Sequence, residues 1–301
     1  MISSYESIIS ASERVAWTID EVIPRDGSLD FSKRFLPDAL VRSEALSFLT
    51  PTEHLKLNQV RGNSYAHLFQ FVEEYIVATC VRHVEAEVFG DEMNLRAMLR
   101  FAEEEVKHQM LFKRFLQVFE RGFGTPCEGI PSQKAVAGII LSKAPMAVMM
   151  ITLHLEVMTQ QHYTQCVQGS DGLDPTFKQM LKSHWAEESQ HAKIDAMTLR
   201  KLALTSTAEL RHHAVQDYLD LVDALTGLLG QQAELDVKSL ERALKKTFTD
   251  EQRAAILANQ KKSYVQTFVT WGITNPMFVE TVEQVFPEDC SRIKDRAAEV
   301  A

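Results

Sequence analysis

Two copies of one short motif carry the residues best suited to chemistry in this sequence. Glu105 and His108 stand three positions apart, and so do Glu188 and His191. In a helix, residues with this spacing share one face about one turn apart. A carboxylate oxygen and an imidazole nitrogen can then reach the same metal ion, so each motif predicts part of a metal site.

The second copy belongs to the stretch HWAEESQHAKID, residues 184–195, which is unusually charged for a helix with an apolar stripe. Placing residues about 100° apart shows that Glu187 and Gln190 fall outside this stripe. The ionisable residues inside it are His184, Glu188, His191 and Asp195. Burying ionised carboxylates costs on the order of several kcal/mol each unless a counter-charge is present. A bound metal ion would supply that charge.

A third copy of the motif, Glu209 with His212, shows that the spacing alone is weak evidence. These two residues face away from the apolar stripe of their helix, so we reject them as ligands. Glu105 and His108, in contrast, share a face with Phe101 and Phe112. Two copies on apolar faces are a much stronger signal than any single copy.

A site for two metal ions also needs carboxylates from two further helices. Glu156 shares a stripe with apolar residues of its own helix. In FQFVEEYIV, Glu73 flanks the apolar centre and Glu74 points nearly opposite, so Glu73 is preferred and Glu74 is the alternative. Glu73 precedes Glu105 by 32 residues, and Glu156 precedes Glu188 by the same 32. The chain therefore repeats a helix with Glu followed by a helix with Glu-x-x-His.

The composition of this site favours a pair of divalent ions. Four glutamates match the charge of two such ions, and mixed carboxylate and imidazole ligands suit iron or manganese better than structural zinc. The alternative is a helical bundle with a polar core network and no metal. It would need six buried ionisable residues in a repeated pattern.

The elements that must position these residues are almost all helices. A capping box from Thr50 to Glu53 opens a helix that Gly62 is expected to interrupt. Further helices are expected at about 63–86, 91–121, 132–141, 145–169, 174–204 and 206–230, with shorter ones beginning at Asp236, Thr249 and Asn275. Short loops make consecutive long helices antiparallel neighbours. We expect one helical domain over 1–301, with a four-helix core at 63–204 and additional helices at the N-terminus and over 206–301.

Composition excludes several classes of protein. The 301 residues are 45% hydrophobic and carry a net charge of -9, which argues against general binding of nucleic acid or anionic membranes. The four cysteines show no CxxC spacing, which argues against a zinc ribbon, a redox dithiol or a disulfide scaffold. The N-terminus does not resemble a signal peptide, and no run suits a membrane span, so we expect a cytoplasmic protein.

Together these residues resemble the ferritin-like di-iron carboxylate proteins. Their signature is two copies of Glu followed about thirty residues later by Asp/Glu-Glu-x-x-His. Here the copies are Glu73 with EEVKH and Glu156 with EESQH. In such families the acid before each ligand is often Asp and can hold a ligand histidine. Glu104 and Glu187 occupy those positions here.

His184 narrows the resemblance, because His184, Glu188 and His191 form His-x-x-x-Glu-x-x-His on one face. This pattern is similar to that of the p-aminobenzoate N-oxygenase family, whose di-iron site carries a third histidine. The match covers mainly residues 65–200. The resemblance implies these metal ligands: Glu73, Glu105, His108, Glu156, His184, Glu188 and His191. The alternative for His184 is a core histidine bonded to a ligand, and Asp195 is expected to hold His191 or His184.

The resemblance also implies a reaction. Two Fe ions, or Mn, would activate O₂ as co-substrate to oxidise a small organic substrate, and in the resembled family this is an amine that passes through hydroxylamine towards nitro. An external electron donor is expected, and a homodimer is plausible for a long bundle. The expected pocket residues lie on the face of Glu156: Met149, Thr152, Thr159, Gln160 and Tyr163. Alternatives are an acyl-carrier-protein desaturase, a C-hydroxylase, and a ferroxidase or iron-storage protein.

Overall fold

The computed structural model describes residues 4–131 and 133–300. Across these two ranges the chain folds into α-helices joined by short connections, with two π-helical segments and no β-strand. The only strand-like pairing there is an isolated bridge between Arg34 and Leu173. The prediction of an all-α fold, with a four-helix bundle and additional helices at both ends, is confirmed.

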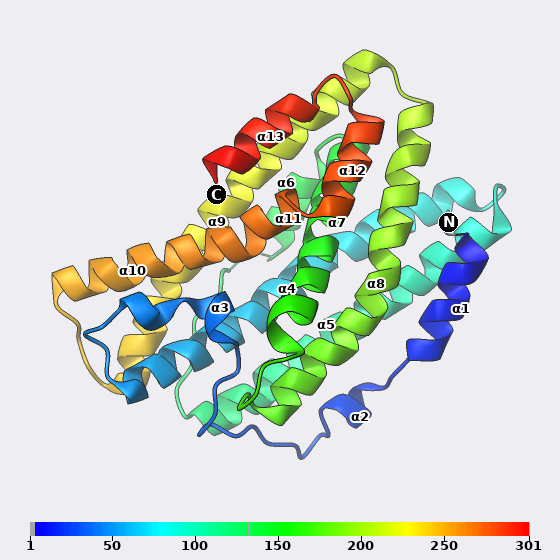
Figure 1. Cartoon of the computed structure of the whole chain (residues 1–301). Helices are drawn as coiled ribbons and strands as arrows, with labels where there is room; N and C mark the ends of the chain where they lie inside the picture. The colour runs from blue at the N-terminus through cyan, green and yellow to red at the C-terminus, as the bar shows by residue number, and fades with distance from the viewer. Residues whose placement is uncertain (1–3, 132, 301) are drawn as a thin grey trace.

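Four long helices form the bundle. They are α4 (Pro51–Glu87), α5 (Glu92–Phe123), α7 (Pro145–Gln161) and α8 (Pro175–Leu204). α4 packs along α5, α7 packs along α8, and α5 also contacts α8 (Figure 1). Each helix with a single glutamate is thus paired with the helix that follows it and carries Glu-x-x-His.

Capping residues fix where three of these helices begin, as the sequence predicts. Thr50 and Glu53 form the expected capping box at the start of α4. The side chain of Asp91 accepts hydrogen bonds from the first turn of α5, and Asp174 does the same for α8. These side chains satisfy amide groups that have no partner inside the helix.

Additional helices surround the bundle. On the N-terminal side, α1 (Tyr5–Val15) lies against α5 and α8, followed by α2 (Ile19–Val22), α3 (Asp38–Val41) and the 3₁₀ turn η1 (Ser43–Ala45). Between α5 and α7, α6 (Gln133–Leu141) packs on α4. The predicted start of this helix at Ser132 lies outside the described residues. The C-terminal helices are α9 (Ala208–Leu244), α10 (Asp250–Tyr264), α11 (Trp271–Ile273), α12 (Pro276–Val285) and α13 (Cys290–Glu299).

α9 differs from its predicted limits. Its N-cap is Thr207, so the helix begins at Ala208 and not at residue 206. The helix also continues through Gly230 and contains Asp236, where a new helix had been expected. Packing explains this continuity, because Ala233, Val237 and Leu240 extend the buried face beyond the glycine. That burial outweighs a glycine penalty of about 1 kcal/mol. The predicted starts at Thr249 and Asn275 are confirmed as helix caps.

The predicted helix over 145–169 changes its geometry near the end. α7 ends at Gln161 and continues as the π-helical segment η2 (His162–Val167). A second π-helical segment, η3 (Val265–Thr270), links α10 to α11. Wider π turns shift the backbone hydrogen bonds and leave carbonyl groups available to other donors.

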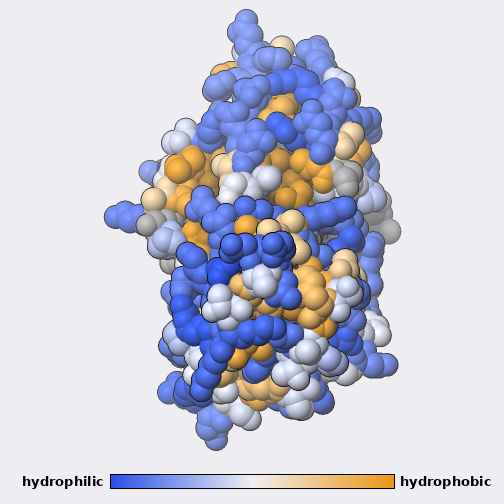
Figure 2. Space-filling model, turned by 90° about the vertical axis from the view of Figure 1, so that its left-hand side faces the viewer, coloured by the Kyte–Doolittle hydropathy of each residue, from blue (hydrophilic) through white to orange (hydrophobic). Residues whose placement is uncertain are grey.

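Figure 2 shows the face on the left-hand side of Figure 1, where hydrophilic side chains dominate and apolar ones lie in small groups between them. Within the described ranges, none of the helices combines the length and apolar content that a membrane crossing requires.

α4 is one continuous helix, so the predicted interruption at Gly62 is wrong. A Cβ atom at Gly62 would lie 2.8 Å from the Cβ atom of Phe35, whose side chain is fully buried. The glycine therefore allows the N-terminal segment to approach α4 closely. It is tolerated inside the helix because this contact compensates for its low helix propensity.

We expect Gly62→Ala to lower the free energy of unfolding by roughly 1–3 kcal/mol, the usual cost of overpacking a core. The first carbon of Phe35 is attached to the backbone and has little room to move. Gly227→Ala is the matched control, because Gly227 also lies inside a helix but nothing lies within 4 Å of its added Cβ atom. That control should be about 0.5–1 kcal/mol more stable. Urea unfolding of both variants would show this, and equal stability would contradict the packing role of Gly62.

Candidate metal centre

The bundle brings seven predicted ligands into one buried region. Each of the four helices contributes at least one of them, and each side chain is 3% exposed or less. They are Glu73 from α4, Glu105 and His108 from α5, Glu156 from α7, and His184, Glu188 and His191 from α8. Six of them form two overlapping groups in which potential ligand atoms lie within 4.8 Å of one another. Glu156 belongs to neither group, although it lines the same small hollow as Glu73, Glu105 and Glu188. His108 and Glu188 belong to both groups, so the geometry fits two neighbouring ions.

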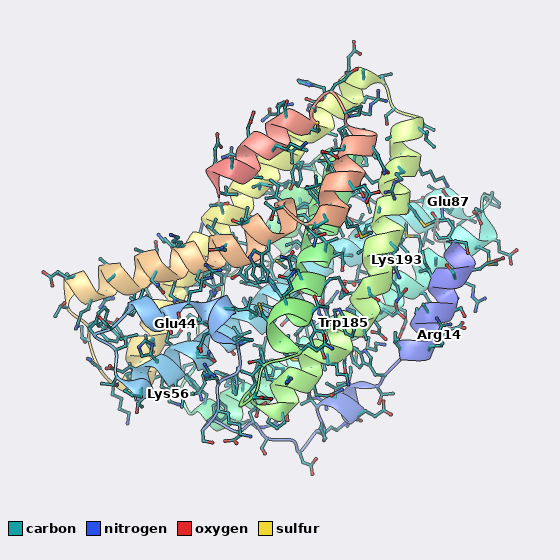
Figure 3. The ribbon with its side chains drawn as sticks, in the orientation of Figure 1. Arg14, Glu44, Lys56, Glu87, Trp185 and Lys193 are labelled. Carbon is teal, nitrogen blue, oxygen red and sulfur yellow. The ribbon has the colours of Figure 1, made fainter. Side chains whose placement is uncertain are left out.

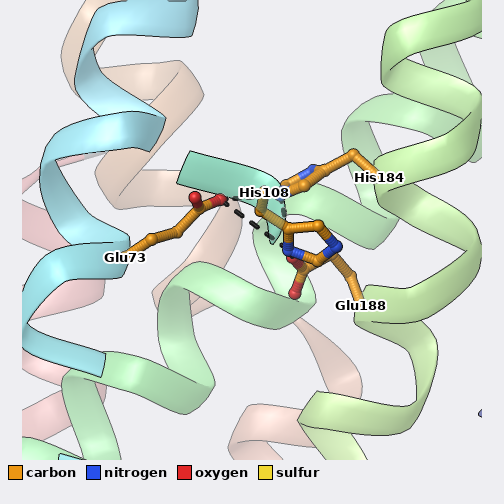
Figure 4. Close-up of side chains that lie close together, drawn as sticks. All are labelled: Glu73, His108, His184 and Glu188. Carbon is orange, nitrogen blue, oxygen red and sulfur yellow. Dashed lines mark hydrogen bonds and ion pairs between the residues drawn. The ribbon is translucent and has the colours of Figure 1, made fainter. Parts of the chain in front are cut away.

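The first group contains Glu73, His108, His184 and Glu188 (Figure 4). His184 Nε2 lies 3.0 Å from Glu73 Oε1 and 2.8 Å from Glu188 Oε1. His108 Nδ1 lies 3.0 Å from the same oxygen of Glu188. Glu73 therefore belongs to this group, whereas its neighbour Glu74 is only half-buried and lies outside both groups.

The second group contains Glu105, His108, Glu188 and His191. His191 Nδ1 lies 2.8 Å from Glu105 Oε1 and 3.2 Å from Glu188 Oε2. His108 Nδ1 lies 3.6 Å from Glu105 Oε1. The two Glu-x-x-His motifs thus face each other across the bundle.

Several of these buried atoms make no hydrogen bond of normal geometry, even where another potential ligand atom lies within 3.0 Å. They are both carboxylate oxygens of Glu105, Nδ1 of His108, and Oε2 of Glu73 and of Glu156. Buried polar atoms are rarely left without partners. Metal bonds of about 2.1 Å also place neighbouring donor atoms about 3 Å apart, the spacing seen here. The residues present therefore fit a pair of metal ions.

The acids before each motif hold the histidines of the opposite helix. Glu187 of α8 lies 2.9 Å from Nε2 of His108, and Glu104 of α5 lies 3.0 Å from Nε2 of His191. A carboxylate on Nε2 leaves Nδ1 aimed at the ligand groups. Lys107 contacts Glu187 at 2.5 Å, and Arg100 contacts Glu104 at 3.2 Å. We call these two glutamate–histidine pairs crossed pairs, because each joins α5 to α8. The glutamate of each crossed pair also contacts a basic side chain that lies nearer the surface.

The electrostatics of the carboxylates reflect a shortage of positive charge. Burial raises the pKa of Glu73 to about 8, although His184 opposes the shift. Burial, followed by the charge of Glu188, raises the pKa of Glu156 well above its ordinary value. For Glu188, burial also acts upwards, but His184 and His191 outweigh it and its pKa is well below the ordinary value. Carboxylates that compete in this way attract cations.

The histidines show the complementary effect. Burial lowers the pKa of His108 and His191, yet the surrounding carboxylates outweigh it and both pKa values lie well above the usual range. Burial would raise the pKa of Glu104, but His191 and then Ser12 hold it at about 2. Protons on the histidines thus supply positive charge that metal ions would replace.

Asp195 does not make its expected hydrogen bond. It is fully buried, its two oxygens have no partner, and burial raises its pKa well above the ordinary value. Both nitrogens of His191 already face glutamates, and His184 Nε2 faces Glu73 and Glu188. Asp195 therefore adds one more buried carboxyl group to the region but does not orient a histidine.

Two other buried histidines form hydrogen bonds with groups outside the metal centre. His154 Nε2 donates to the carbonyl of Phe268, and His162 Nε2 donates to that of Thr267, each over 2.9 Å. Both carbonyls belong to η3. Because a carbonyl only accepts, each Nδ1 is the acceptor for a tyrosine hydroxyl. Burial lowers the pKa of both histidines to about 4, so they are neutral structural residues.

The rejected third motif lies at the surface. Both Glu209 and His212 are exposed, and Nδ1 of His212 pairs with Asp289 at 2.8 Å.

The predicted pocket residues do not form a pocket as expected. Thr159 lines a hollow of about 10 Å³ beside the carboxylates, but the other four do not. Gln160 donates to the carbonyl of Trp185 over 3.3 Å, and the ring of Tyr163, in η2, stacks on the ring of Trp185. Figure 3 labels Trp185 on α8. Thr152 bonds to the carbonyl of Val148, and Met149 is buried in the core. This face of α7 is filled by packing; a larger apolar cavity, of about 290 Å³, lies beside it.

The N-terminal segment completes the site, which the sequence did not reveal. The ring of Trp17 stacks on His108 with centroids 5.9 Å apart, and Lys107 lies over Trp17 at 4.4 Å. The hydroxyl of Ser12 donates to Glu104, a contact across 92 positions of the chain. Glu187, which faces α5, and Gln190, where α8 packs against α1, are both buried, so their predicted position outside the apolar stripe is wrong.

Comparison with known proteins gives a limited result. No family model matches the chain, and no curated protein matches it. Three solved structures of R2-like ligand-binding oxidase variants with reconstituted Mn/Fe cofactors are similar, at 12%, 16% and 15% identity. They cover 87%, 87% and 88% of this chain and 91%, 92% and 93% of their own, each with a TM-score of 0.46. Similarity at this level does not identify a reaction for this chain.

We expect His191→Ala to lower the iron bound per chain, because it removes a nitrogen that faces two carboxylates. His212→Ala is the matched control: it removes the histidine of the exposed third motif and should leave iron binding unchanged. Elemental analysis after anaerobic loading with Fe(II) would measure both. Equal iron content in the two variants would contradict the proposed ligand role of His191.

We expect Glu104→Gln to weaken metal binding about 10–100-fold, since it removes the charge that orients His191. Glu103→Gln changes the neighbouring residue, which is exposed, and should have no effect. Competition with a metal chelator would give both affinities. A similar affinity for the two variants would show that the crossed pair does not support the metal.

Proposed function

We propose that this chain is a di-metal oxidase that binds two iron ions, with manganese as the alternative, and uses O₂ to oxidise a small organic substrate. The observation that carries this proposal is the pair of overlapping ligand groups sharing His108 and Glu188, with buried carboxylate oxygens that accept no hydrogen bond of normal geometry. Iron ions bound there would supply redox chemistry and open positions for O₂.

The protein's own residues balance the charge of the bound ions and keep water out of the site. Four ligand glutamates balance two divalent ions. Aromatic rings exclude water from the histidines: Phe101 stacks on His191 with centroids 4.0 Å apart, and Phe112 contacts His184 edge-on at 5.0 Å. A dry site strengthens every electrostatic interaction inside it. It also protects reactive species from water.

We further propose that the reaction is oxygenation at nitrogen, from an amine towards hydroxylamine and nitro. His184 supports this proposal, because it adds a third histidine nitrogen to a site that carboxylates would otherwise dominate. Its nitrogen lies within 3.0 Å of Glu73 and of Glu188. The electrons for O₂ reduction would come from an external donor.

Anaerobic loading with Fe(II), followed by exposure to O₂, tests the proposal. We expect two irons per chain and O₂ consumption that speeds up when an amine is added, with an oxidised amine as product by mass spectrometry. Less than one iron per chain would exclude the di-metal centre. Conversion of excess iron into a mineral core would instead indicate iron storage.

We expect His184→Ala to retain iron but to change the absorption spectrum after O₂ exposure and to lower amine turnover. His213→Ala, at an exposed position, is the control and should behave as the unchanged protein. Unchanged spectra and turnover in His184→Ala would remove His184 from the ligands.

A further inference from the structure

The apolar cavity of about 290 Å³ lies among α4, α6, α7 and α9. Aliphatic and aromatic side chains form almost all of its lining. Among the described residues that line it, only Tyr75 and Gln231 carry polar side chains, and none is charged. Such a lining provides no counter-charge for an ionic ligand.

This cavity lies directly beside the metal centre. Val72 and Leu155 line both the cavity and the small hollow that contains the carboxylates. Each immediately precedes a ligand, Glu73 and Glu156 respectively. A single layer of side chains therefore separates the two spaces.

Tyr75 forms part of the same boundary. Its ring lines the cavity, while its hydroxyl lies 3.4 Å from Oγ1 of Thr152, one turn before Glu156 on α7. The cavity therefore has a polar group at the side facing the metal centre. Gln231, on α9, provides its other polar side chain.

We propose that this cavity binds the substrate of the metal centre, and that the substrate is an uncharged, mainly apolar molecule. This inference rests on the proposed oxidase function. Transferring an ion into such surroundings without a partner is strongly unfavourable. A cavity of 150 Å³ accommodates benzene, so the present volume suits roughly twelve non-hydrogen atoms.

The charge requirement divides the amines into two groups. Arylamines are neutral at physiological pH, because the ring delocalises the nitrogen lone pair. Alkylamines are protonated, and aromatic amino acids and aminobenzoates carry a carboxylate. The cavity thus selects an arylamine without an acidic group, or another neutral arene.

The outer rim offers a route for such a molecule. Ile139 on α6 and Ala224 on α9 line the cavity and are both exposed. A ligand can therefore reach the cavity between these two helices, on the side away from the carboxylates.

Calorimetric titration of the Fe(II)-loaded protein without O₂ tests this inference. The probes are 4-propylaniline, 4-aminobenzoate and 3-phenylpropylamine, which have equal numbers of non-hydrogen atoms but are neutral, anionic and cationic. We expect 4-propylaniline to bind at least tenfold more tightly than either charged probe. Equal binding of all three, or tighter binding of a charged one, would overturn the assignment.

Substitutions that fill the cavity test whether 4-propylaniline binds there. Ala224→Trp, which fills the cavity from its exposed rim, should weaken 4-propylaniline binding at least tenfold. Val136→Phe approaches from α6 and should act similarly. Ala254→Trp is the matched control at an exposed position of α10 and should bind normally. Normal binding in both filling variants would place the ligand elsewhere and overturn the inference.

Iron content and O₂ consumption, measured on the same preparations, separate this inference from the proposed function. Selective binding that depends on Ala224, without O₂ consumption, would contradict the oxidase and uphold the cavity as a site for neutral ligands. Normal O₂ consumption without selective binding would contradict the cavity alone.

Discussion

The concentration of negative charge inside the bundle is the constraint on which the rest of the structure depends. Seven carboxylates are buried together: Glu73, Glu104, Glu105, Glu156, Glu187, Glu188 and Asp195. Arg100 and Lys107 reach only the two outermost of them. The capped helices, the crossed glutamate–histidine pairs and the aromatic shell all hold these groups where two cations can neutralise them. Without such neutralisation, repulsion and desolvation would oppose the packing of the four helices.

The sequence could predict those parts of the site that depend on local geometry. Helical periodicity places Glu105 beside His108 and distinguishes Glu73 from Glu74, and caps such as Asp91 locate helix starts. The burial of Gln190 could not be predicted, because it depends on α1, more than 170 residues earlier in the chain. The cavity also escaped prediction. Its walls come from four helices, whereas a helical plot describes only one.

Local signals failed where tertiary contacts outweighed them. Gly62 and Gly230 both suggest a break, yet both lie inside long helices, one against Phe35 and the other between two buried stretches of α9. Propensities near 1 kcal/mol are small beside the burial of several apolar side chains. The same balance explains why Asp236 does not begin a helix: it is buried and bonded to Ser64 and Tyr264.

The π-helical segment η3 has a consequence for the spacing of the whole C-terminal region. A π turn contains one more residue than an α turn, so it corresponds to a single-residue insertion in a regular helix. Removing that residue would restore α geometry but rotate everything after it by about 100°. The carbonyls that accept hydrogen bonds from His154 and His162 would then point elsewhere, and α12 would lose its alignment with α7 and α8. The number of residues in this segment is therefore fixed by the hydrogen bonds that its backbone accepts.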